Sequence, residues 1–208
     1  MFELFIPFLL LLLFILAIIW RINARKYVSS GTVASAYDAW TQDKLLERLW
    51  GEHIHLGFYP SEKKNIDFRK AKVQFVHELV KWSDLDKLPK GSRILDVGCG
   101  IGGSSRILAK YYGFNVTGIT ISPAQVKRAR ELTPSGLNCN FQVMDALNLK
   151  FDDGVFDAVW SVEAGAHMHD KTRFADEMLR TLRPGGYLAL ADWNSRDLKV
   201  THHLFLRR

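Results

Sequence analysis

Hydrophobic residues follow three different patterns along this 208-residue chain. Residues 4–20 (LFIPFLLLLLFILAIIW) carry no charged side chain, residues 33–50 and 65–82 repeat apolar positions at helical spacing, and beyond residue 92 short apolar runs alternate with amphipathic segments. Strands that alternate with helices of ten to fifteen residues are typical of a parallel α/β sheet. The pattern therefore predicts an α/β domain that follows a helical segment and an apolar N-terminus.

The expected elements can be placed from this pattern and from turn and cap residues. Helices are expected at 33–50, 65–82, 104–113, 122–133 and 171–182, and strands at 93–98, 115–121, 139–145, 156–162 and 187–193. Ser122 is the expected N-cap of its helix, with Pro123 at the first helical position. The helix at 65–82 carries a predicted core stripe of Phe68, Val73, Val76, Leu79 and Val80.

The apolar run at the N-terminus is near the lower limit of about 17–25 residues for a membrane helix. The positive charges of Arg21, Arg25 and Lys26 follow it, which favours an uncleaved single-pass anchor with the rest of the chain on the cytoplasmic side, or on the equivalent face of an organelle. A cleaved signal peptide and an interfacial helix are the alternatives. We expect an anchor at 1–26, a linker at 27–32, a helical lid segment at 33–90, an α/β core at 91–194 and an atypical tail at 195–208.

The overall charge limits the classes of partner. The formal net charge is +6 without a long basic run, which disfavours nucleic acid and suits an anionic membrane surface better. The cations of Lys63, Lys64, Arg69 and Lys70 either lie near lipid headgroups or form an ordinary solvated face. The two cysteines, Cys99 and Cys139, have no CxxC spacing and are expected to be reduced core residues.

The stretch WGEHIHLGFY (50–59) is unusual because polar and apolar residues alternate in it. In an extended segment His53, His55 and Tyr59 share one face, and the apolar residues Ile54, Leu56 and Phe58 share the other. We expect a lid strand or turn that presents its histidines to a pocket. No functional metal site is expected, because neither a cysteine cluster nor an HExxH motif accompanies the pairs His53/His55, His167/His169 and His202/His203.

The glycine-rich stretch LDVGCGIGGSS (95–105) joins an expected strand to a helix. Gly98, Gly100 and Gly103 satisfy the GxGxxG pattern of dinucleotide sites. An NAD site also needs a carboxylate about twenty residues later, where this chain has Thr120, and this disfavours a membrane-anchored oxidoreductase. The tighter spacing of Gly98, Gly100 and Gly102 after Asp96 favours S-adenosylmethionine.

LDVGCGIGGSSRIL resembles the first motif of class I S-adenosylmethionine-dependent methyltransferases, whose fold is a Rossmann-like parallel sheet with flanking helices. GITISPAQVKRA, YDAW, WGEHIHLGFY, VWSVEAGAHMHDK and LRPGGYLALADWN narrow the resemblance to the γ-tocopherol methyltransferase type. Within that type the chain is most similar to the enzymes that methylate 2-methyl-6-phytylbenzoquinol in tocopherol and plastoquinone synthesis. The resemblance covers residues 33–194.

The resemblance implies a set of S-adenosylmethionine-binding residues. Thr120 and Gln125 take the positions that contact the cofactor in this branch, Asp145 faces the adenine amino group and Ala146 offers its backbone N–H. Tyr37 matches a position that reaches the cofactor carboxylate, although it equally fits a packing role. The implied cofactor residues are Tyr37, Asp96, Gly98, Gly100, Gly102, Thr120, Gln125, Asp145 and Ala146.

The implied acceptor is a ring carbon of a prenylated hydroquinone, with a γ-tocopherol or sterol-type acceptor as the alternative. A base near a ring hydroxyl would raise the electron density at the ortho carbon. Glu163 and His167 are the first candidates for orienting or deprotonating the hydroquinone, followed by His55. Glu163 as a cap of its loop and His167 as a polar lid residue are the alternative interpretations.

The region after residue 194 departs from the family. A class I sheet normally continues with a helix and two further strands, whereas this sequence continues with SRDLKVTHHLFLRR. We expect a C-terminally truncated member that lacks those strands and much of the acceptor pocket. An inactive methyltransferase that binds only the cofactor is therefore a further alternative.

Overall fold

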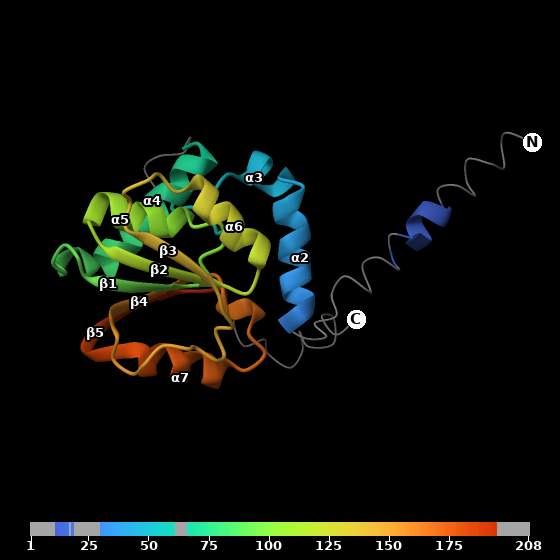
Figure 1. Cartoon of the computed structure of the whole chain (residues 1–208). Helices are drawn as coiled ribbons and strands as arrows, with labels where there is room; N and C mark the ends of the chain where they lie inside the picture. The colour runs from blue at the N-terminus through green and yellow to red at the C-terminus, as the bar shows by residue number, and fades with distance from the viewer. Residues whose placement is uncertain (1–10, 17, 19–29, 61–65, 195–208) are drawn as a thin grey trace, which may run out of the picture.

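The computed structural model describes residues 11–16, 18, 30–60 and 66–194. These residues form a five-stranded parallel sheet with the strand order β3-β2-β1-β4-β5 (Figure 1). The strands are β1 (Arg93–Val97), β2 (Asn115–Thr120), β3 (Cys139–Val143), β4 (Phe156–Val162) and β5 (Leu182–Ala191). The predicted fold class, a Rossmann-like parallel sheet with flanking helices, is confirmed.

Helices cover both faces of this sheet. Figure 1 shows α4, α5 and α6 on one face and α7 on the other, while α2 lies alongside α6 at the right of the view. The helices are α2 (Ser30–Gln42), α3 (Leu45–Trp50), α4 (Phe68–Trp82), α5 (Gly103–Tyr112), α6 (Pro123–Leu132) and α7 (Lys171–Thr181), with short 3₁₀ turns at Leu85–Lys87 and Gly165–His167. The crossovers place every carboxyl end of the sheet at one edge.

The core consists of two apolar layers, one on each face of the sheet. Ile94 and Trp160 join residues of α4 and α5 in one layer, whereas Leu95 and Val159 join Phe174 and Met178 of α7 in the other. Neighbouring residues of a strand point to opposite faces, so the central strands β1 and β4 contribute to both layers and read as nearly continuous apolar runs. Phe141 of β3 instead packs with Val126 and Ala129 of α6.

Local cap chemistry sets most of the helix boundaries. The Ser122 side chain accepts from the backbone N–H of Gln125, and Gly113 ends α5 in the left-handed conformation. α4 begins at Phe68 rather than at residue 65, because the Asp67 side chain accepts from the backbone N–H groups of the two residues after Phe68. Phe68 is 39% exposed, so its assignment to the core stripe was wrong.

The helix predicted at 33–50 is two helices. Lys44 adopts φ 55°, and the chain bends there between α2 and α3. The bend lets α2 pack along α6 while α3 directs the Glu47 carboxylate to Arg128 of α6, at 2.7 and 2.8 Å. α2 already begins at Ser30, inside the stretch expected to be a linker.

β5 starts earlier than predicted. Leu182 pairs with Phe156, the pairing is then irregular over Pro184 and the following glycines, and regular pairing resumes at Tyr187. Among the strands of the described residues β5 is an edge strand. Its apolar side chains Leu188 and Leu190 are partly exposed.

The predicted membrane anchor lies mostly outside the described residues. Residues 11–16 are helical. Within the part of the chain that the structure describes, no helix combines the length and apolar character needed to cross a membrane. His202, His203, Lys63 and Lys64 also fall outside the described residues.

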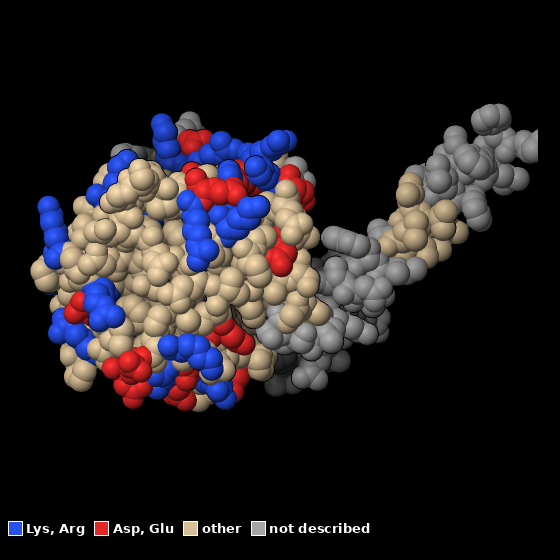
Figure 2. All heavy atoms as spheres, in the orientation of Figure 1, with Lys and Arg blue, Asp and Glu red and all other residues tan. Residues whose placement is uncertain are grey.

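Charged side chains do not form one continuous basic surface on the face shown in Figure 2. Lysine and arginine side chains lie beside aspartate and glutamate side chains at the top and bottom of this face, on either side of a broad band of other residues. Among the described residues, Arg128 pairs with Glu131 and Arg180 pairs with Glu177. On this face of the described residues, positive and negative side chains are therefore intermixed.

Candidate active site

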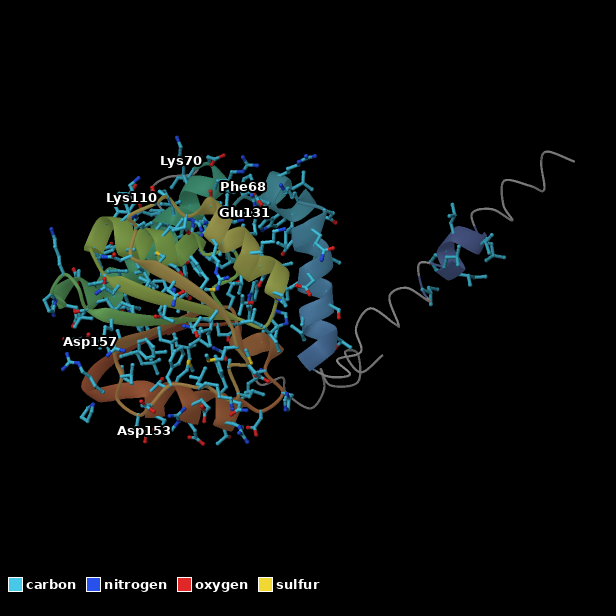
Figure 3. The ribbon with its side chains drawn as sticks, in the orientation of Figure 1. Phe68, Lys70, Lys110, Glu131, Asp153 and Asp157 are labelled. Atoms are coloured by element: carbon cyan, nitrogen blue, oxygen red, sulfur yellow. The ribbon has the colours of Figure 1, made fainter. Side chains whose placement is uncertain are left out.

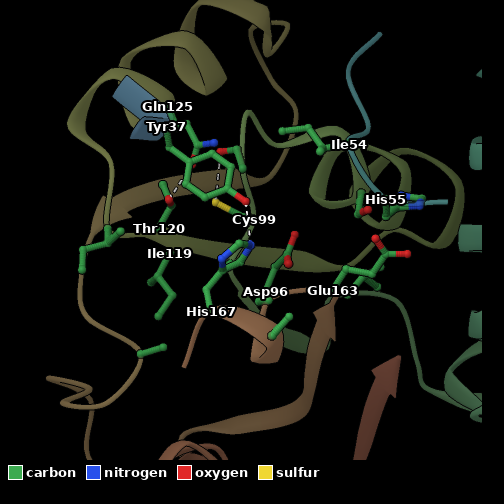
Figure 4. Close-up of a pocket in the computed structure, with 18 of the residues that line it drawn as sticks. Tyr37, Ile54, His55, Asp96, Cys99, Ile119, Thr120, Gln125, Glu163 and His167 are labelled. Atoms are coloured by element: carbon green, nitrogen blue, oxygen red, sulfur yellow. Dashed lines mark hydrogen bonds between the residues drawn. The ribbon is translucent and has the colours of Figure 1, made fainter. Parts of the chain in front are cut away.

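A pocket of about 400 Å³ opens at the carboxyl edge of the sheet. In the strand order β3-β2-β1-β4-β5 the topology switches between β1 and β4, where α/β proteins characteristically bind ligands. The chain segments after β1 and β4 form its floor, and α2 and the 51–59 segment form its opposite wall. Figure 4 shows the Asp96, Glu163 and His167 side chains directed toward the same space.

The glycine loop after β1 approaches the pocket with its backbone. Gly98 has φ 81°, and a Cβ there would lie 2.4 Å from the Ala164 Cβ. Gly100 has φ 55°, and a Cβ there would meet no atom within 4 Å, so it would project into open space beside the pocket. The loop therefore leaves room for a ligand against bare backbone.

Gly102 differs from the other two predicted glycines. It does not line the pocket, and it precedes α5 with φ 81°. A Cβ at this position would lie 2.6 Å from the Phe141 ring and 2.9 Å from Arg106. The structure thus gives Gly102 a packing position beneath the loop.

Asp96 lies in β1, directly before the loop, and it is buried. Its Oδ2 accepts a hydrogen bond from Ser105 Oγ at 2.5 Å. Burial raises the pKa of this carboxyl to about 7, although the hydrogen bond from Ser105 lowers the pKa by a smaller amount. The group is suited to pair with a ligand cation inside the pocket.

The ends of β2 and β3 contribute polar groups on the other side of the loop. Thr120 Oγ1 donates to Gln125 Oε1 at 2.6 Å, which fixes the amide so that its NH₂ group remains a donor (Figure 4). Asp145 Oδ1 accepts from the Leu147 backbone N–H at 2.9 Å, and Ala146 is buried beside it. All four predicted residues line the pocket.

The end of β4 turns sharply into the pocket wall. Glu163 has φ 53°, a conformation that residues other than glycine rarely adopt. Its Oε1 accepts from the Leu56 backbone N–H at 3.0 Å, so this carboxylate connects the core to the opposite wall. His167 Nε2 lies 2.8 Å from Tyr37 Oη, and burial lowers the His167 pKa.

The 51–59 segment is irregular backbone rather than a strand, yet its burial alternates from Gly51 to Phe58 and breaks only at Tyr59, which is exposed. His55 is only 8% exposed, whereas Leu56 is 51% exposed. Lys72 of α4 causes this arrangement: its Nζ donates to the Trp50 and His53 carbonyls at 3.0 and 2.8 Å and holds the segment with the histidines inward. Tyr59 does not line the pocket.

Ion pairs and hydrogen bonds between residues far apart in the sequence hold the wall formed by α2 and the 51–59 segment in place. Glu52 pairs with Arg106 of α5 at 2.7 Å, in addition to the pair between Glu47 and α6. Asp38 accepts from Ser122 Oγ and from the backbone N–H of Ala124. Neither Asp38 nor Glu52 was predicted from the sequence, and only the position of Asp38 beside Tyr37 in YDAW pointed to it.

Neither a metal site nor a reactive thiol is found among the described residues. Within residues 11–16, 18, 30–60 and 66–194, no three His, Cys, Asp or Glu side chains gather as a metal site would require. Cys99 lines the pocket, and burial raises its pKa well above the usual value. The Cys99 thiol is therefore protonated, as a small packing residue would be.

The chain matches the family described as methyltransferase domain over residues 95–190. It is 60% identical over 179 residues to the 2-methyl-6-phytyl-1,4-hydroquinone methyltransferase of Synechocystis sp., and the match covers 86% of this chain and 56% of that protein. It is 40% identical over 166 residues to the chloroplastic tocopherol O-methyltransferase of Arabidopsis thaliana, with coverage of 75% and 48%. The chain spans about half the length of the curated relatives it matches.

A solved structure shares the fold. The crystal structure of the [4+2]-cyclase SpnF superimposes with a TM-score of 0.68 and 31% sequence identity, over 77% of this chain and 58% of that chain. The reaction in its name is a cyclisation rather than a methyl transfer. The fold alone therefore does not determine the reaction, and the residues of the pocket must be considered.

Proposed function

Because the chain belongs to the class I S-adenosylmethionine-dependent methyltransferases, we propose that it methylates a ring carbon of a prenylated benzoquinol in tocopherol and plastoquinone synthesis. The observation that carries this proposal is the 60% identity over 179 residues to a hydroquinone methyltransferase. The pocket at the topological switch point supports it, since polar groups and bare glycine backbone converge there.

The pocket residues fit S-adenosylmethionine. The open space at Gly100 accommodates the cofactor against the backbone, and Asp96 offers a buried carboxylate for its ammonium group. Thr120 and Gln125 offer hydrogen bonds to ribose hydroxyls. The Asp145 carboxylate offers an acceptor for the adenine amino group. When bound, the cofactor supplies a sulfonium methyl group to a carbon nucleophile.

The acceptor side of the pocket has groups that can bind a ring hydroxyl. Glu163 and His167 follow β4 and line the pocket opposite the 51–59 segment. A hydroxyl that donates to one of them gains phenolate character, which raises electron density at the neighbouring ring carbon. Tyr37 fixes His167 through its 2.8 Å contact, so the imidazole is oriented before the acceptor binds.

Cofactor affinity should depend on pH through Asp96. The carboxyl is mostly protonated below its pKa of about 7 and becomes a partner for the cofactor ammonium above it. Affinity should therefore rise about tenfold between pH 6 and pH 8, measured by isothermal titration calorimetry. Asp96→Asn should bind more weakly and show a flat profile. Equal affinity of the unaltered chain at both pH values would contradict this role.

We also propose that residues 4–20 anchor the chain in a membrane, with the α/β core on the cytoplasmic side. Seventeen residues without charge followed by Arg21, Arg25 and Lys26 support this, and a prenylated quinol itself partitions into the bilayer. The full chain should sediment with membranes in high salt, whereas a chain that begins at Tyr27 should stay in the supernatant. Full release of the intact chain by salt would exclude an anchor.

Methyl transfer is tested directly with methyl-labelled S-adenosylmethionine and three acceptors: 2-methyl-6-phytylbenzoquinol, γ-tocopherol and a sterol. The proposal predicts label on a ring carbon of the benzoquinol, with Glu163→Gln and His167→Gln each about 10²-fold slower. Label only on γ-tocopherol or the sterol would favour the alternative acceptor class. Cofactor binding without transfer to any acceptor would indicate a chain that only binds the cofactor.

A further inference from the structure

Two histidines of the 51–59 segment form a hydrogen-bonded chain with a defined direction. His55 Nδ1 lies 2.7 Å from the Leu56 carbonyl oxygen, which can only accept, so this nitrogen carries the proton. A neutral His55 then has a bare Nε2, which lies 3.1 Å from His53 Nδ1. His53 must donate through Nδ1, and its own Nε2 is left without a proton.

Both imidazoles are neutral in this environment. Burial lowers the pKa of His53 to about 3, with smaller contributions in the same direction from the nearby His55, Arg106 and Lys72. Burial also lowers the pKa of His55, although the Leu56 carbonyl and Glu163 raise it. The hydrogen bonds therefore run from His53 to His55 and from His55 to the Leu56 carbonyl, with one proton on each ring.

The free nitrogen of His53 is not fully buried. Within the described residues His53 Nε2 makes no hydrogen bond, and the only fully buried side-chain nitrogen or oxygen lacking a partner there is Trp160 Nε1. His53 Nε2 is therefore accessible. His53 lines the pocket, and its ring packs on Gly103, where a Cβ would lie 2.8 Å from the imidazole Cε1.

His55 is in a different position. Both of its ring nitrogens are engaged, one by Leu56 and one by His53. The ring also lies against Phe75, with 5.1 Å between centroids. His55 therefore has no nitrogen left for a substrate, and it acts as a positioning residue that sets the tautomer of His53.

We propose that His53 Nε2 accepts a hydrogen bond from a ring hydroxyl of the methyl acceptor and makes the pocket selective for the reduced, hydroquinone form. This inference rests on the proposed function. The neutral Nε2 of His53 and the Glu163 carboxylate, which lines the pocket on the opposite side, are both acceptors, so they match a ligand with O–H donors. A quinone has only acceptor oxygens, and it would leave the His53 nitrogen unpaired.

The tautomer is tested on the full chain by long-range ¹H–¹⁵N NMR of the histidine rings, with signals assigned from His53→Asn and His55→Gln. Between pH 6 and pH 8 we expect both Nδ1 atoms protonated and both Nε2 atoms bare. Addition of 2-methyl-6-geranyl-1,4-benzoquinol under argon should shift the His53 Nε2 signal. A proton on His53 Nε2, or a shift at His55 Nε2 instead, would overturn the proposal.

Selectivity is tested by the affinities of that benzoquinol, its quinone and its dimethyl ether in the presence of S-adenosylhomocysteine. Loss of one hydrogen bond should make the quinone and ether bind about tenfold more weakly. His53→Asn keeps an amide near the Nδ1 position but lacks the Nε2 acceptor, and it should bind all three equally. His53→Gln, with an amide near the Nε2 position, should recover part of the difference.

The outcomes separate this inference from the proposed function. A chain that binds S-adenosylhomocysteine but binds quinol, quinone and ether alike refutes the role of His53 and leaves the cofactor site standing. Failure to bind any benzoquinol, in a chain that binds the cofactor product, also refutes it. A chain that binds neither S-adenosylmethionine nor S-adenosylhomocysteine refutes the proposed function itself.

Discussion

Gly100→Leu is expected to lower the affinity for S-adenosylmethionine by about 100-fold or more, which corresponds to roughly 2.7 kcal/mol. A Cβ at this position meets no protein atom within 4 Å, so the side chain enters space beside the pocket instead of displacing the core. The leucine therefore occupies the volume where the cofactor would lie against the backbone. Isothermal titration calorimetry gives the affinity, and urea unfolding gives the stability of the same variant.

The matched control is Gly136→Leu. Gly136 also has a positive φ, 86°, and a Cβ there would again meet no atom within 4 Å, but this glycine is exposed and does not line the pocket. Each variant forces a side chain into left-handed backbone at a cost of about 1–2 kcal/mol of stability. Only the Gly100 variant should lose cofactor affinity. Equal losses of affinity in both would attribute the effect to backbone strain.

Lys72→Met is expected to destabilise the fold by about 2–3 kcal/mol, because two buried charge-assisted hydrogen bonds are lost. Lys72 is only 3% exposed, and its ammonium lies 5.1 Å from the ring centroids of both Trp50 and Phe68. Methionine retains the length and apolar stem but leaves the Trp50 and His53 carbonyls without this donor. The midpoint of urea unfolding measures the loss.

Lys70→Met is the control on the same helix. Lys70 is exposed at the N-terminal end of α4, near Phe68, as Figure 3 shows, and its replacement should change stability by less than about 0.5 kcal/mol. Lys72→Met should in addition shift the NMR signals of the His53 and His55 rings, which Lys70→Met should not. A stability of Lys72→Met equal to that of the unaltered chain would show that the 51–59 segment does not depend on this lysine.

The fold was predictable where the determining residues are close together in sequence. Ser122 and Asp170 cap α6 and α7 as their types and positions suggest, and the strand–glycine loop–helix unit around Asp96 follows from consecutive residues. The cofactor-side residues were identified from the resemblance, and they lie near one another because parallel strands end at one edge of the sheet. Their cofactor roles remain predictions from the resemblance.

The wall opposite the glycine loop was not predictable in this way. The break after α2 lets the Glu47 carboxylate form an ion pair with Arg128, which lies 81 residues further along the chain. Alternation in 51–59 placed the histidines toward the pocket but did not reveal what holds them there, since Lys72 of a separate helix decides this. The tautomers of His53 and His55 depend on a backbone carbonyl that no side-chain pattern reveals.

Equilibrium dialysis of the full chain against S-adenosylmethionine, S-adenosylhomocysteine and NADH distinguishes the two cofactor classes that the glycine loop could hold. We predict one S-adenosylmethionine per chain, displaced by S-adenosylhomocysteine and lost in Gly100→Leu, with no NADH bound. NADH should not bind because Thr120 stands where a dinucleotide site needs a carboxylate. Binding of NADH without S-adenosylmethionine would contradict the proposed function and assign the pocket to dinucleotide chemistry.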